Sequence, residues 1–480
     1  MFKAKMPSLS LRPCRTRLAV SALAVLAAGC SFIPTYQRPD APIPAQFPGP
    51  AAGVVDSRPA ADIPWQEFVQ DARLRAIVAR ALDGNRDLRV AALAIEQARA
   101  QYQIRSADRT PTLNLAASGN RQPASSGNGI SSTYTAGVAL ASWEIDFFGR
   151  IASLEESALA QYFATQEARS AVQTSLVAAL ANAWLSLQTN DALLALTERT
   201  LATRDDSLRL TQLRFDQGVS SALDLRQAES LTAAARATLA QQRRLRALDV
   251  NTLTLLAGAP LPDDLLHTGT EAVVAFAQVP AGLPSDLLER RPDVRQAEQQ
   301  LRAANANIGA ARAAFFPRIA LTASAGTASS ALSGLFKGGS WGWTLAPQAL
   351  LPIFDGGRNQ ASLDSALVGR QVAVAQYEKA IQVAFREAAD ALASRAALAQ
   401  QLSATQEQAQ AESERFRLAN LRYRNGIASY LDVLDAQRAL FATQQAVAQI
   451  QLARRQNEVA LYKALGGGWR GAEVEQSSNS

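Results

Sequence analysis

The feature that most constrains the fold of this chain is a long internal repeat. The segment Leu418–Asp435 closely matches Leu210–Asp224, which lies about 208 residues earlier. In both copies a glycine follows a long helical pattern, where a left-handed backbone ends a helix, and a serine then precedes the next helical pattern as an N-cap. The residues concerned are Gly218, Ser221, Gly426 and Ser429. Each copy therefore predicts a sharp turn between two long helices, with tips at about 215–221 and 423–429.

Each repeat also contains a pair of segments that alternate between apolar and other residues. These segments predict two strand pairs, at about 111–147 and about 317–352, each joined by a loop rich in glycine and serine. The strands are long enough to cross a bilayer, and the loops have the composition of exposed tips. The first repeat is expected at 63–258 and the second at 285–466. A linker at 259–284 joins them, and a disordered tail at 467–480 ends the chain.

The helices of the hairpins are unusually long. Residues 150–215 contain no proline and no glycine, and about 65 helical residues would span roughly 100 Å. The chain is 48% hydrophobic but only 6% aromatic, because alanine supplies much of the apolar content. Alanine-rich faces allow neighbouring helices to approach closely.

The strand count constrains the assembly. Four strands cannot close a barrel, and open strand edges are not tolerated in lipid. Two copies would give about eight strands, whose interior is filled by side chains, whereas three copies would give about twelve and leave a lumen. The sequence therefore predicts an α+β membrane protein. Its trimer would form a 12-stranded transmembrane β-barrel, with four strands from each chain, continuous with a long α-helical barrel. The alternatives are a soluble antiparallel sheet with a tryptophan-rich core and a coiled-coil bundle with a solid core.

Aromatic residues near the second strand pair fit a membrane interface. Trp341 and Trp343 share one face of a predicted strand, and Phe336 lies nearby. Aromatic belts of this kind flank the apolar band of transmembrane barrels.

The N-terminus has the pattern of a secretory signal. Residues 1–29 combine a basic start with an apolar run that is too short to span a bilayer. The signal ends at Leu26-Ala-Ala-Gly-Cys30, which resembles a bacterial lipobox, so Cys30 is the expected lipidation site. By resemblance to lipoprotein sorting, Ser31 indicates the outer membrane. Residues 30–62 are rich in proline and predict an extended, lipidated tether. The alternative is an ordinary signal peptide with a chance cysteine.

The sequence offers little support for catalysis or for nucleic-acid binding. His267 is the single histidine, which excludes a histidine triad or a histidine metal cluster, and no phosphate-binding loop is present. The net charge of +6 is concentrated in the signal segment, so the rest of the chain is nearly neutral. We expect no catalytic residues, no metal, no cofactor other than the lipid on Cys30, and no nucleic-acid partner.

Several blocks resemble the TolC-like outer membrane factors, in their lipidated NodT/OprM-type branch. Those blocks are Tyr36–Pro39 after Cys30, Leu287–Glu298, Ala304–Pro317 and Tyr423–Arg438, in this order. The resemblance covers nearly the whole mature chain. It implies a homotrimeric duct in the bacterial outer membrane, lipid-anchored and barrel-inserted, that extends into the periplasm. Its implied partners are a periplasmic adaptor and an inner-membrane pump of the resistance-nodulation-division (RND) type that exports drugs and other toxic compounds.

The resemblance also suggests where the duct closes. In related proteins the residues matching Tyr423, Arg424 and Asp435 form the periplasmic gate, and we add Asp432 as an acidic ring that could favour cations. Arg424 to Asp435 is the expected cross-link, with the Tyr423 hydroxyl assisting. The first tip has Phe215-Asp216 at the matching place, so only the second hairpin is expected to gate. A simple solvated salt bridge at the tip is the alternative.

The turn residues of both tips, Gly218, Ser221, Gly426 and Ser429, are expected to dock the adaptor. Other functions stay open at this point. The chain could be a duct for a metal-ion pump or for type I protein secretion, or a structural lipoprotein that conducts nothing.

Overall fold

The computed structural model describes residues 31–47, 58–123, 129–266, 276–280 and 286–469. The described residues fall into two compact units. Unit 1 takes its residues from 31–39, 95–164 and 297–376, and unit 2 from 40–94, 165–296 and 377–469. Cys30 and His267 lie outside the described residues.

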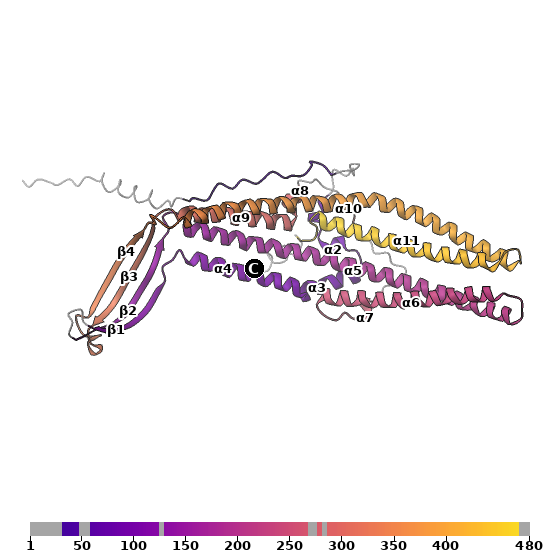
Figure 1. Ribbon diagram of the computed structural model, residues 1–480, viewed down its shortest axis with the longest axis horizontal. Coiled ribbons are helices and arrows are strands. Elements are labelled where there is room, and N and C mark those ends of the chain that lie inside the picture. Colours follow the sequence, from indigo (N-terminus) through magenta and orange to yellow (C-terminus); the bar gives the residue numbers. More distant parts are fainter. Residues whose placement is uncertain (1–30, 48–57, 124–128, 267–275, 281–285, 470–480) are drawn as a thin grey trace, which may run out of the picture. The chain divides into compact units, whose positions relative to one another are not determined.

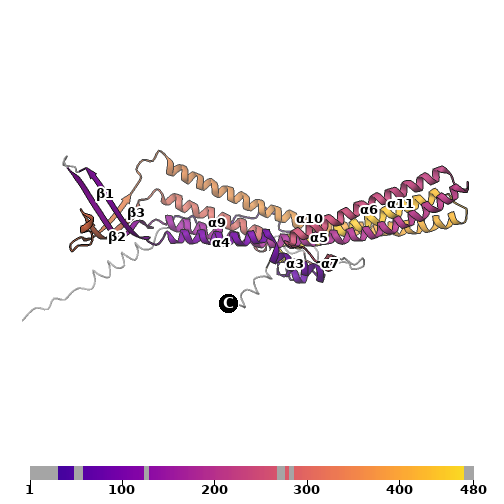
Figure 2. The same cartoon turned by 90° about the horizontal axis from the view of Figure 1, so that it is seen from below.

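Unit 1 contains one antiparallel sheet of four strands in the order β1-β2-β3-β4 (Figures 1 and 2). The strands are β1 (Leu113–Pro123), β2 (Ile130–Ile145), β3 (Arg318–Ser329) and β4 (Trp341–Leu350). The two strand pairs lie within the ranges expected from the alternating pattern. Strand β2 pairs with β3, so the sheet joins the two repeats side by side.

A bulge interrupts the pairing of β2 with β3. The register shifts between Leu140 and Trp143, and Ser142 has a positive φ of 47°. One extra residue in β2 bends the strand locally and re-aims the side chains that follow it. The bulge lies near the end of β2 that leads into the first long helix.

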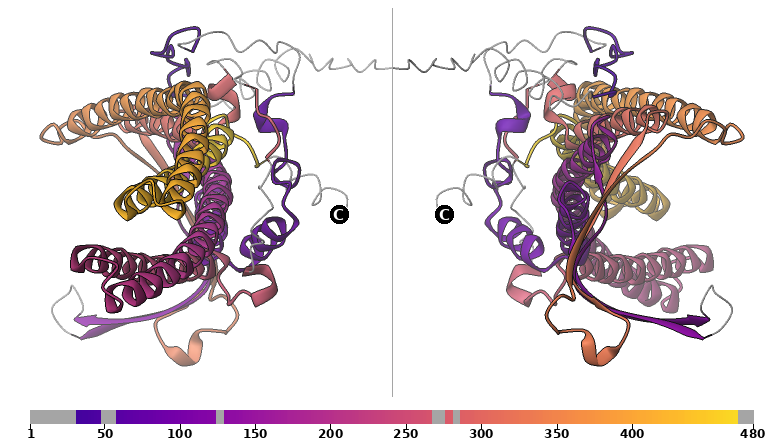
Figure 3. Two further views of the ribbon diagram at one scale, coloured as in Figure 1. Left: turned by 90° about the vertical axis from the view of Figure 1, so that its right-hand side faces the viewer. Right: turned by 90° about the vertical axis from the view of Figure 1, so that its left-hand side faces the viewer.

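The helices have the lengths expected from the proline- and glycine-poor stretches. The four that carry the hairpins are α5 (Arg150–Asp216), α6 (Ala222–Ala257), α10 (Arg358–Arg424) and α11 (Tyr430–Ala464). The remaining helices are η1 (Ala60–Asp62), α2 (Trp65–Phe68), α3 (Ala72–Gly84), α4 (Arg86–Ala107), α7 (Asp263–Leu266), α8 (Asp286–Arg290), α9 (Pro292–Ala313) and η2 (Leu332–Gly334). In unit 2, α5 pairs with α6 and α10 pairs with α11, and the two hairpins are seen end-on in Figure 3.

The two tips form as the repeated turn predicts, with one difference. Gly218 and Gly426 both have a φ of 72°, in the left-handed region that favours glycine. Ser221 caps α6 in a capping box with Asp224, and the Ser221 hydrogen bond lowers the pKa of that carboxyl. Ser429 occupies the N-cap of α11 but makes no side-chain capping hydrogen bond, so this part of the expectation is wrong.

Unit 2 has a compact core away from the tips. Phe68 stacks on Tyr462 with ring centroids 3.8 Å apart, and the Tyr462 hydroxyl donates to the Ile63 carbonyl at 2.6 Å. Burial raises the pKa of Tyr462. Trp469 is buried and its Nε1 donates to the Arg290 carbonyl at 2.8 Å. The packed region therefore reaches Trp469, beyond the expected start of the tail at residue 467.

Candidate functional site

The sheet has two chemically different faces. Opposed residues of paired strands lie on the same face, and successive residues alternate between faces. One face is apolar and includes Leu113, Leu115, Leu140, Leu321, Trp343 and Leu345. The other is mostly small or polar and includes Asn114, Ser118, Thr135, Ser324, Thr344 and Gln348. This alternation is what a barrel wall between lipid and an aqueous lumen requires.

The expected interface aromatics lie on or beside this sheet. Trp341 and Trp343 are in β4 on its apolar face, and their side chains are 68% and 66% exposed. Phe336 is also exposed, but it lies in the loop between β3 and β4.

A network of ion pairs lies at the base of the sheet in unit 1. The Glu144 carboxylate, 9% exposed, accepts from Arg150 at 2.8 and 2.7 Å and from Arg318 at 2.5 Å. The hydrogen bonds to Glu144 raise the pKa of Arg150. Arg150 is the first residue of α5, so Glu144 ties the end of β2 to the start of that helix and to β3.

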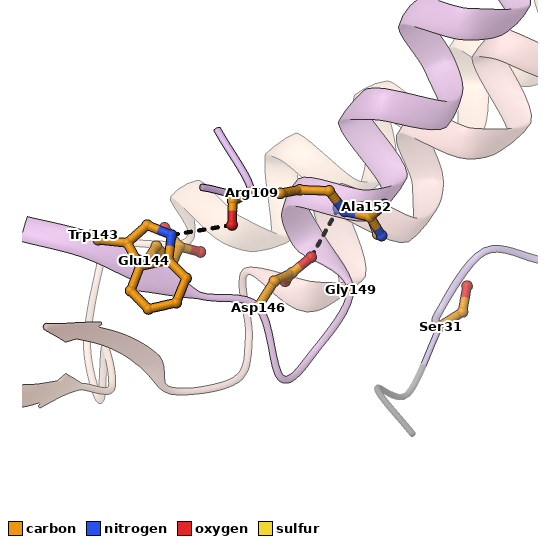
Figure 4. Close-up of a pocket in the computed structure, with 7 residues that line it drawn as sticks. All are labelled: Ser31, Arg109, Trp143, Glu144, Asp146, Gly149 and Ala152. Atoms are coloured by element: carbon orange, nitrogen blue, oxygen red, sulfur yellow. Dashed lines mark hydrogen bonds between the residues drawn. The ribbon is translucent and has the colours of Figure 1, made fainter. Parts of the chain in front are cut away.

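A cavity of ≈ 320 Å³ lies next to this network (Figure 4). Its polar side chains are engaged by the protein itself. Asp146 accepts from the backbone amides of Arg150 and Ala152 at 2.7 and 2.8 Å, and Trp143 Nε1 donates to the Arg109 carbonyl at 3.3 Å. The cavity therefore belongs to a structural joint rather than to a ligand site.

The hairpin tips make a contact that the sequence did not predict. Arg214, near the end of α5, donates from Nη1 to the hydroxyl of Tyr423, near the end of α10. The Arg214 guanidinium also lies 5.3 Å from the centre of the Tyr423 ring, within the range of a cation–π contact. The Tyr423 ring in turn lies 5.1 Å from that of Tyr430. Tyr423 therefore links the first hairpin to the second.

The acidic residues of the second tip are placed differently from the expectation. Asp435 pairs with Arg415 across the hairpin, at 2.5 Å between Nη2 and Oδ2. Arg415 also pairs with Glu412 at 3.1 Å, and its hydrogen bonds to Asp435 and Glu412 raise its pKa. Within the described part of the chain, Arg424 and Asp432 make no ion pair. The anticipated Arg424–Asp435 bridge is therefore not formed in the single chain.

Comparison with known proteins decides the family. Residues 77–259 and 283–467 match the profile of a family described as outer membrane efflux protein. The chain belongs to the outer membrane efflux protein family. Members of this family are outer membrane channels. This membership confirms the predicted α+β fold class, the trimeric barrel and the outer-membrane location.

Individual relatives are similar over almost their whole length. The chain is 47% identical over 464 residues to the toluene efflux pump outer membrane protein TtgC of Pseudomonas putida, covering 95% of this chain and 96% of that protein. It is 45% identical over 466 residues to the outer membrane protein OprJ of Pseudomonas aeruginosa, covering 94% and 96%. Its structure resembles the open state of the MtrE outer membrane channel of Neisseria gonorrhoeae, with a TM-score of 0.85, 39% identity and coverage of 92% and 99%.

In this family member the start of the tether is docked along one face of α9. Phe32 stacks on Phe316 with centroids 4.5 Å apart, and Asn305 Nδ2 donates to the Pro34 carbonyl at 2.7 Å. A Cβ on Gly309 would lie 2.5 Å from Ile33 Cγ1, so the helix is in close contact with the segment there. We call residues 31–38 the strap.

Glu298 holds the other end of the strap. Its side chain is 6% exposed and accepts from the Tyr36 hydroxyl at 3.1 Å, from Arg38 Nε and Nη2 at 3.2 and 2.9 Å, and from Arg302 Nη2 at 3.1 Å. Burial alone would raise the pKa of Glu298, but the hydrogen bonds and charges of Arg38 and Arg302 outweigh burial and lower it.

Sequence reasoning missed three contacts of the candidate site: Arg214 with Tyr423, Arg415 with Asp435, and Glu298 with the strap. Glu298 and Tyr36 each lie in one of the family-like blocks, but nothing in those blocks pairs the two residues. The partners of Glu298 in the strap are separated from it by 260 and 262 residues, so no local pattern indicated the contact.

Proposed function

We propose that this protein is the outer-membrane duct of a tripartite efflux system. In this proposal the trimer is a passive channel that carries drugs or other toxic small molecules from an inner-membrane RND-type pump, through a periplasmic adaptor, to the outside. The observation that carries the proposal is the two-faced sheet with two free edges, because such a sheet makes a lumen when three copies close it. The relative TtgC, named a toluene efflux pump outer membrane protein, supports a small apolar toxic substrate.

The gate of this duct is proposed at the hairpin tips. Tyr423, Arg424, Asp432 and Asp435 keep their assignment, with Arg214 and Arg415 added as partners. The Arg214–Tyr423 contact holds the two hairpins of one chain together, and the Arg415–Asp435 pair holds the two helices of the second hairpin. Each contact is exposed and therefore weak, so adaptor binding at the tips can supply the free energy that breaks them.

The adaptor is proposed to dock on the turns around Gly218, Ser221, Gly426 and Ser429. The lipid is proposed on Cys30, directly before the strap. The docked strap supports this placement, because it fixes the segment that follows the cysteine.

Single-channel conductance in a planar bilayer tests the duct and its gate. The purified wild-type trimer would be compared with Tyr423→Phe, Arg214→Met, Asp435→Ala and Arg424→Ala. We expect a small wild-type conductance that rises in the first three variants, because each loses a contact that holds the tips together. Arg424→Ala should raise it only if Arg424 acts between protomers.

Arg417→Met is the matched control, since Arg417 pairs with Glu414 on the same helix and links no two helices. A large conductance that none of these variants changes would keep the duct and reject this gate. No conductance in any variant, from protein shown to be folded and trimeric, would reject the duct.

Substrate class is tested in cells that lack their own outer-membrane channel. Expression of this protein with a cognate RND pump and adaptor should restore resistance to toluene and to hydrophobic antibiotics. Restored resistance to metal ions alone would instead favour a metal-ion pump as the partner.

A further inference from the structure

Two polar side chains of unit 2 are buried where the two hairpins meet, and each lacks a partner for one polar atom. One is Arg204 on α5, and the other is Tyr430, the first residue of α11. Within the described chain, Arg204 Nε and the Tyr430 hydroxyl are buried and have no hydrogen-bond partner. A buried donor without a partner costs free energy, which is regained when water reaches it. Both groups therefore favour an arrangement in which the hairpins are further apart.

Arg204 contacts three helices and no carboxylate. Its side chain is 5% exposed and donates from Nη1 to the Leu231 carbonyl of α6 at 2.9 Å. The guanidinium also lies 5.4 Å from the centre of the Phe441 ring on α11. Within the described chain no carboxylate lies within ion-pair distance of Arg204, and the charge of Arg438 on α11 has the same sign. The packing of the second hairpin on the first thus keeps an uncompensated positive charge away from water.

The internal repeat shows that a long hairpin helix does not require this unpaired charge. Helices α5 and α10 have the same length, and both their ends are 208 residues apart in the sequence. Arg204 therefore corresponds to Glu412, which pairs with Arg415 on its own helix at 3.1 Å. The second hairpin compensates the charge at this position, whereas the first hairpin leaves it without a partner of opposite sign.

Tyr430 lies next to the contact that joins the two tips. Its ring centroid is 5.1 Å from that of Tyr423, and the Arg214 guanidinium lies 5.3 Å from the same Tyr423 ring. The Tyr423 hydroxyl accepts from Arg214, whereas the Tyr430 hydroxyl makes no hydrogen bond within the described chain. The corresponding residues of the first tip are Phe215 and Ala222, so this pair of hydroxyls is particular to the second tip. One of the two hydroxyls holds the hairpins together, and the other gains from their separation.

We propose that Arg204 and Tyr430 bias the gate towards opening, against the contacts that hold the tips together. While the hairpins are packed together, both groups are withdrawn from water, and separation of the hairpins hydrates them. Adaptor binding then needs to supply only the difference between the two opposing sets of interactions. This inference rests on the proposed function and deepens it, because it adds to the gate two residues that act in the opposite direction.

The two groups act at different levels of the hairpins. Tyr430 is the first residue of α11, and Phe441, which contacts Arg204, lies about 16 Å further along the axis of that helix. Groups this far apart that share no partner contribute independently to an equilibrium. Removal of both groups should therefore change the opening equilibrium by the product of the two single changes.

The ratio of open to closed time in single-channel recordings tests the proposal. The recordings use the Asp435→Ala background, in which the gate has lost one contact and a decrease in opening can be seen. We expect Tyr430→Phe and Arg204→Met each to lower this ratio about fivefold, which is the lower end of the penalty for a buried polar group without a partner. The two substitutions together should lower it about 25-fold.

Each substitution has a matched control in the same background. Tyr423→Phe removes the same atom as Tyr430→Phe from the neighbouring tyrosine, but it should raise the ratio of open to closed time because that hydroxyl accepts from Arg214. Arg209→Met removes an arginine of α5 whose side chain is 76% exposed, and it should leave the ratio unchanged. Opposite results from two Tyr→Phe substitutions at adjacent rings would separate the two roles directly.

Thiol labelling of the full-length trimer gives a second readout that does not depend on conduction. Gln437→Cys places a thiol one turn before Phe441 on the same face of α11, at a position that is 8% exposed. Its labelling rate should fall about fivefold when Arg204→Met or Tyr430→Phe is added. If Asp435→Ala does not open the channel, the gate assigned under the proposed function is wrong, and the labelling rate still decides whether the two groups favour separation of the hairpins.

A rise of the open ratio or of the labelling rate in Arg204→Met or Tyr430→Phe would overturn the proposal, because it would show that the group has a partner in the trimer and holds the hairpins together. Unchanged values in both variants would overturn it as well. A higher melting temperature with no change in opening or labelling would show that the two groups affect the stability of the fold and not the gate, which also contradicts the proposal.

Discussion

Glu298 is expected to control how firmly the strap is docked on α9. The substitution Glu298→Gln keeps the shape of the side chain and removes its charge. Four donors on Tyr36, Arg38 and Arg302 converge on this carboxylate. The substitution should therefore release the strap without disturbing the helix that carries it.

The free energy lost in Glu298→Gln depends on how exposed the carboxylate and its two arginine partners are. A charge-assisted hydrogen bond contributes about 1.5–3 kcal/mol. The side chains of Arg38 and Arg302 are 43% and 46% exposed, so solvent screens part of their interaction, and a neutral amide still accepts one bond. We expect a loss of about 2 kcal/mol, which raises the open population of the strap roughly 30-fold.

Thiol labelling measures that population. Ile33→Cys places a thiol on the side of the strap that faces Gly309. The labelling rate of this thiol in the Glu298→Gln background should rise roughly 30-fold over the rate with Glu298 intact. Arg38→Met should have a similar effect. Glu414→Gln, which removes an exposed pair with Arg417, is the control and should leave the rate unchanged. An unchanged rate in Glu298→Gln would refute the assigned role of this carboxylate.

The same site predicts a pH dependence. The folded pKa of Glu298 is lowered, so its contribution is present above the unfolded value, about 4.3, and is lost as the pH falls through the folded pKa. With a disulfide reagent that reacts at acid pH, the strap should open as the pH falls through the lowered folded pKa of Glu298. The Glu298→Gln variant should not show this transition.

Two further predictions concern packing. Gly137→Ala should destabilise the trimer by at least about 3 kcal/mol, because a Cβ there would lie 2.4 Å from the Ala325 carbonyl oxygen and 2.6 Å from Gly326 Cα, both of them backbone atoms. Arg204→Met should raise the free energy of unfolding by about 1 kcal/mol, as measured by thermal melting of the trimer. Arg204 is 5% exposed and has no carboxylate within ion-pair distance in the described chain, and burial followed by the nearby charge of Arg438 lowers its pKa.

Each packing prediction has a matched control. Gly338→Ala should be neutral, because no atom lies within 4 Å of the added Cβ. Arg209→Met should change little, since that side chain is 76% exposed. A normal melting temperature for Gly137→Ala, or a lower one for Arg204→Met, would show that the corresponding argument is wrong.

The sequence by itself determined the elements and their order. Strand alternation, the glycine of each tip and the long proline-free helices are local patterns. They specify the backbone conformation of a segment whatever its neighbours in the fold are. The internal repeat then implied two hairpins and two strand pairs, and the rule that lipid tolerates no open edge implied the trimer.

Tertiary structure alone decided which side chains meet. Arg424 looked like the partner of Asp435 because both lie close to the tip. Arg415 lies nine residues earlier on α10, about two and a half turns away, so the two arginines point to opposite sides of the helix, and the side that meets α11 carries Arg415. Likewise, the contact of Arg214 with Tyr423 depends on how the two hairpins pack. The contact of Glu298 with the strap depends on where the strap binds along α9, and the strap is an extended segment with no repeating sequence pattern that would indicate this place. Such contacts are set by helix phase and packing over long sequence separations, which a single sequence does not display.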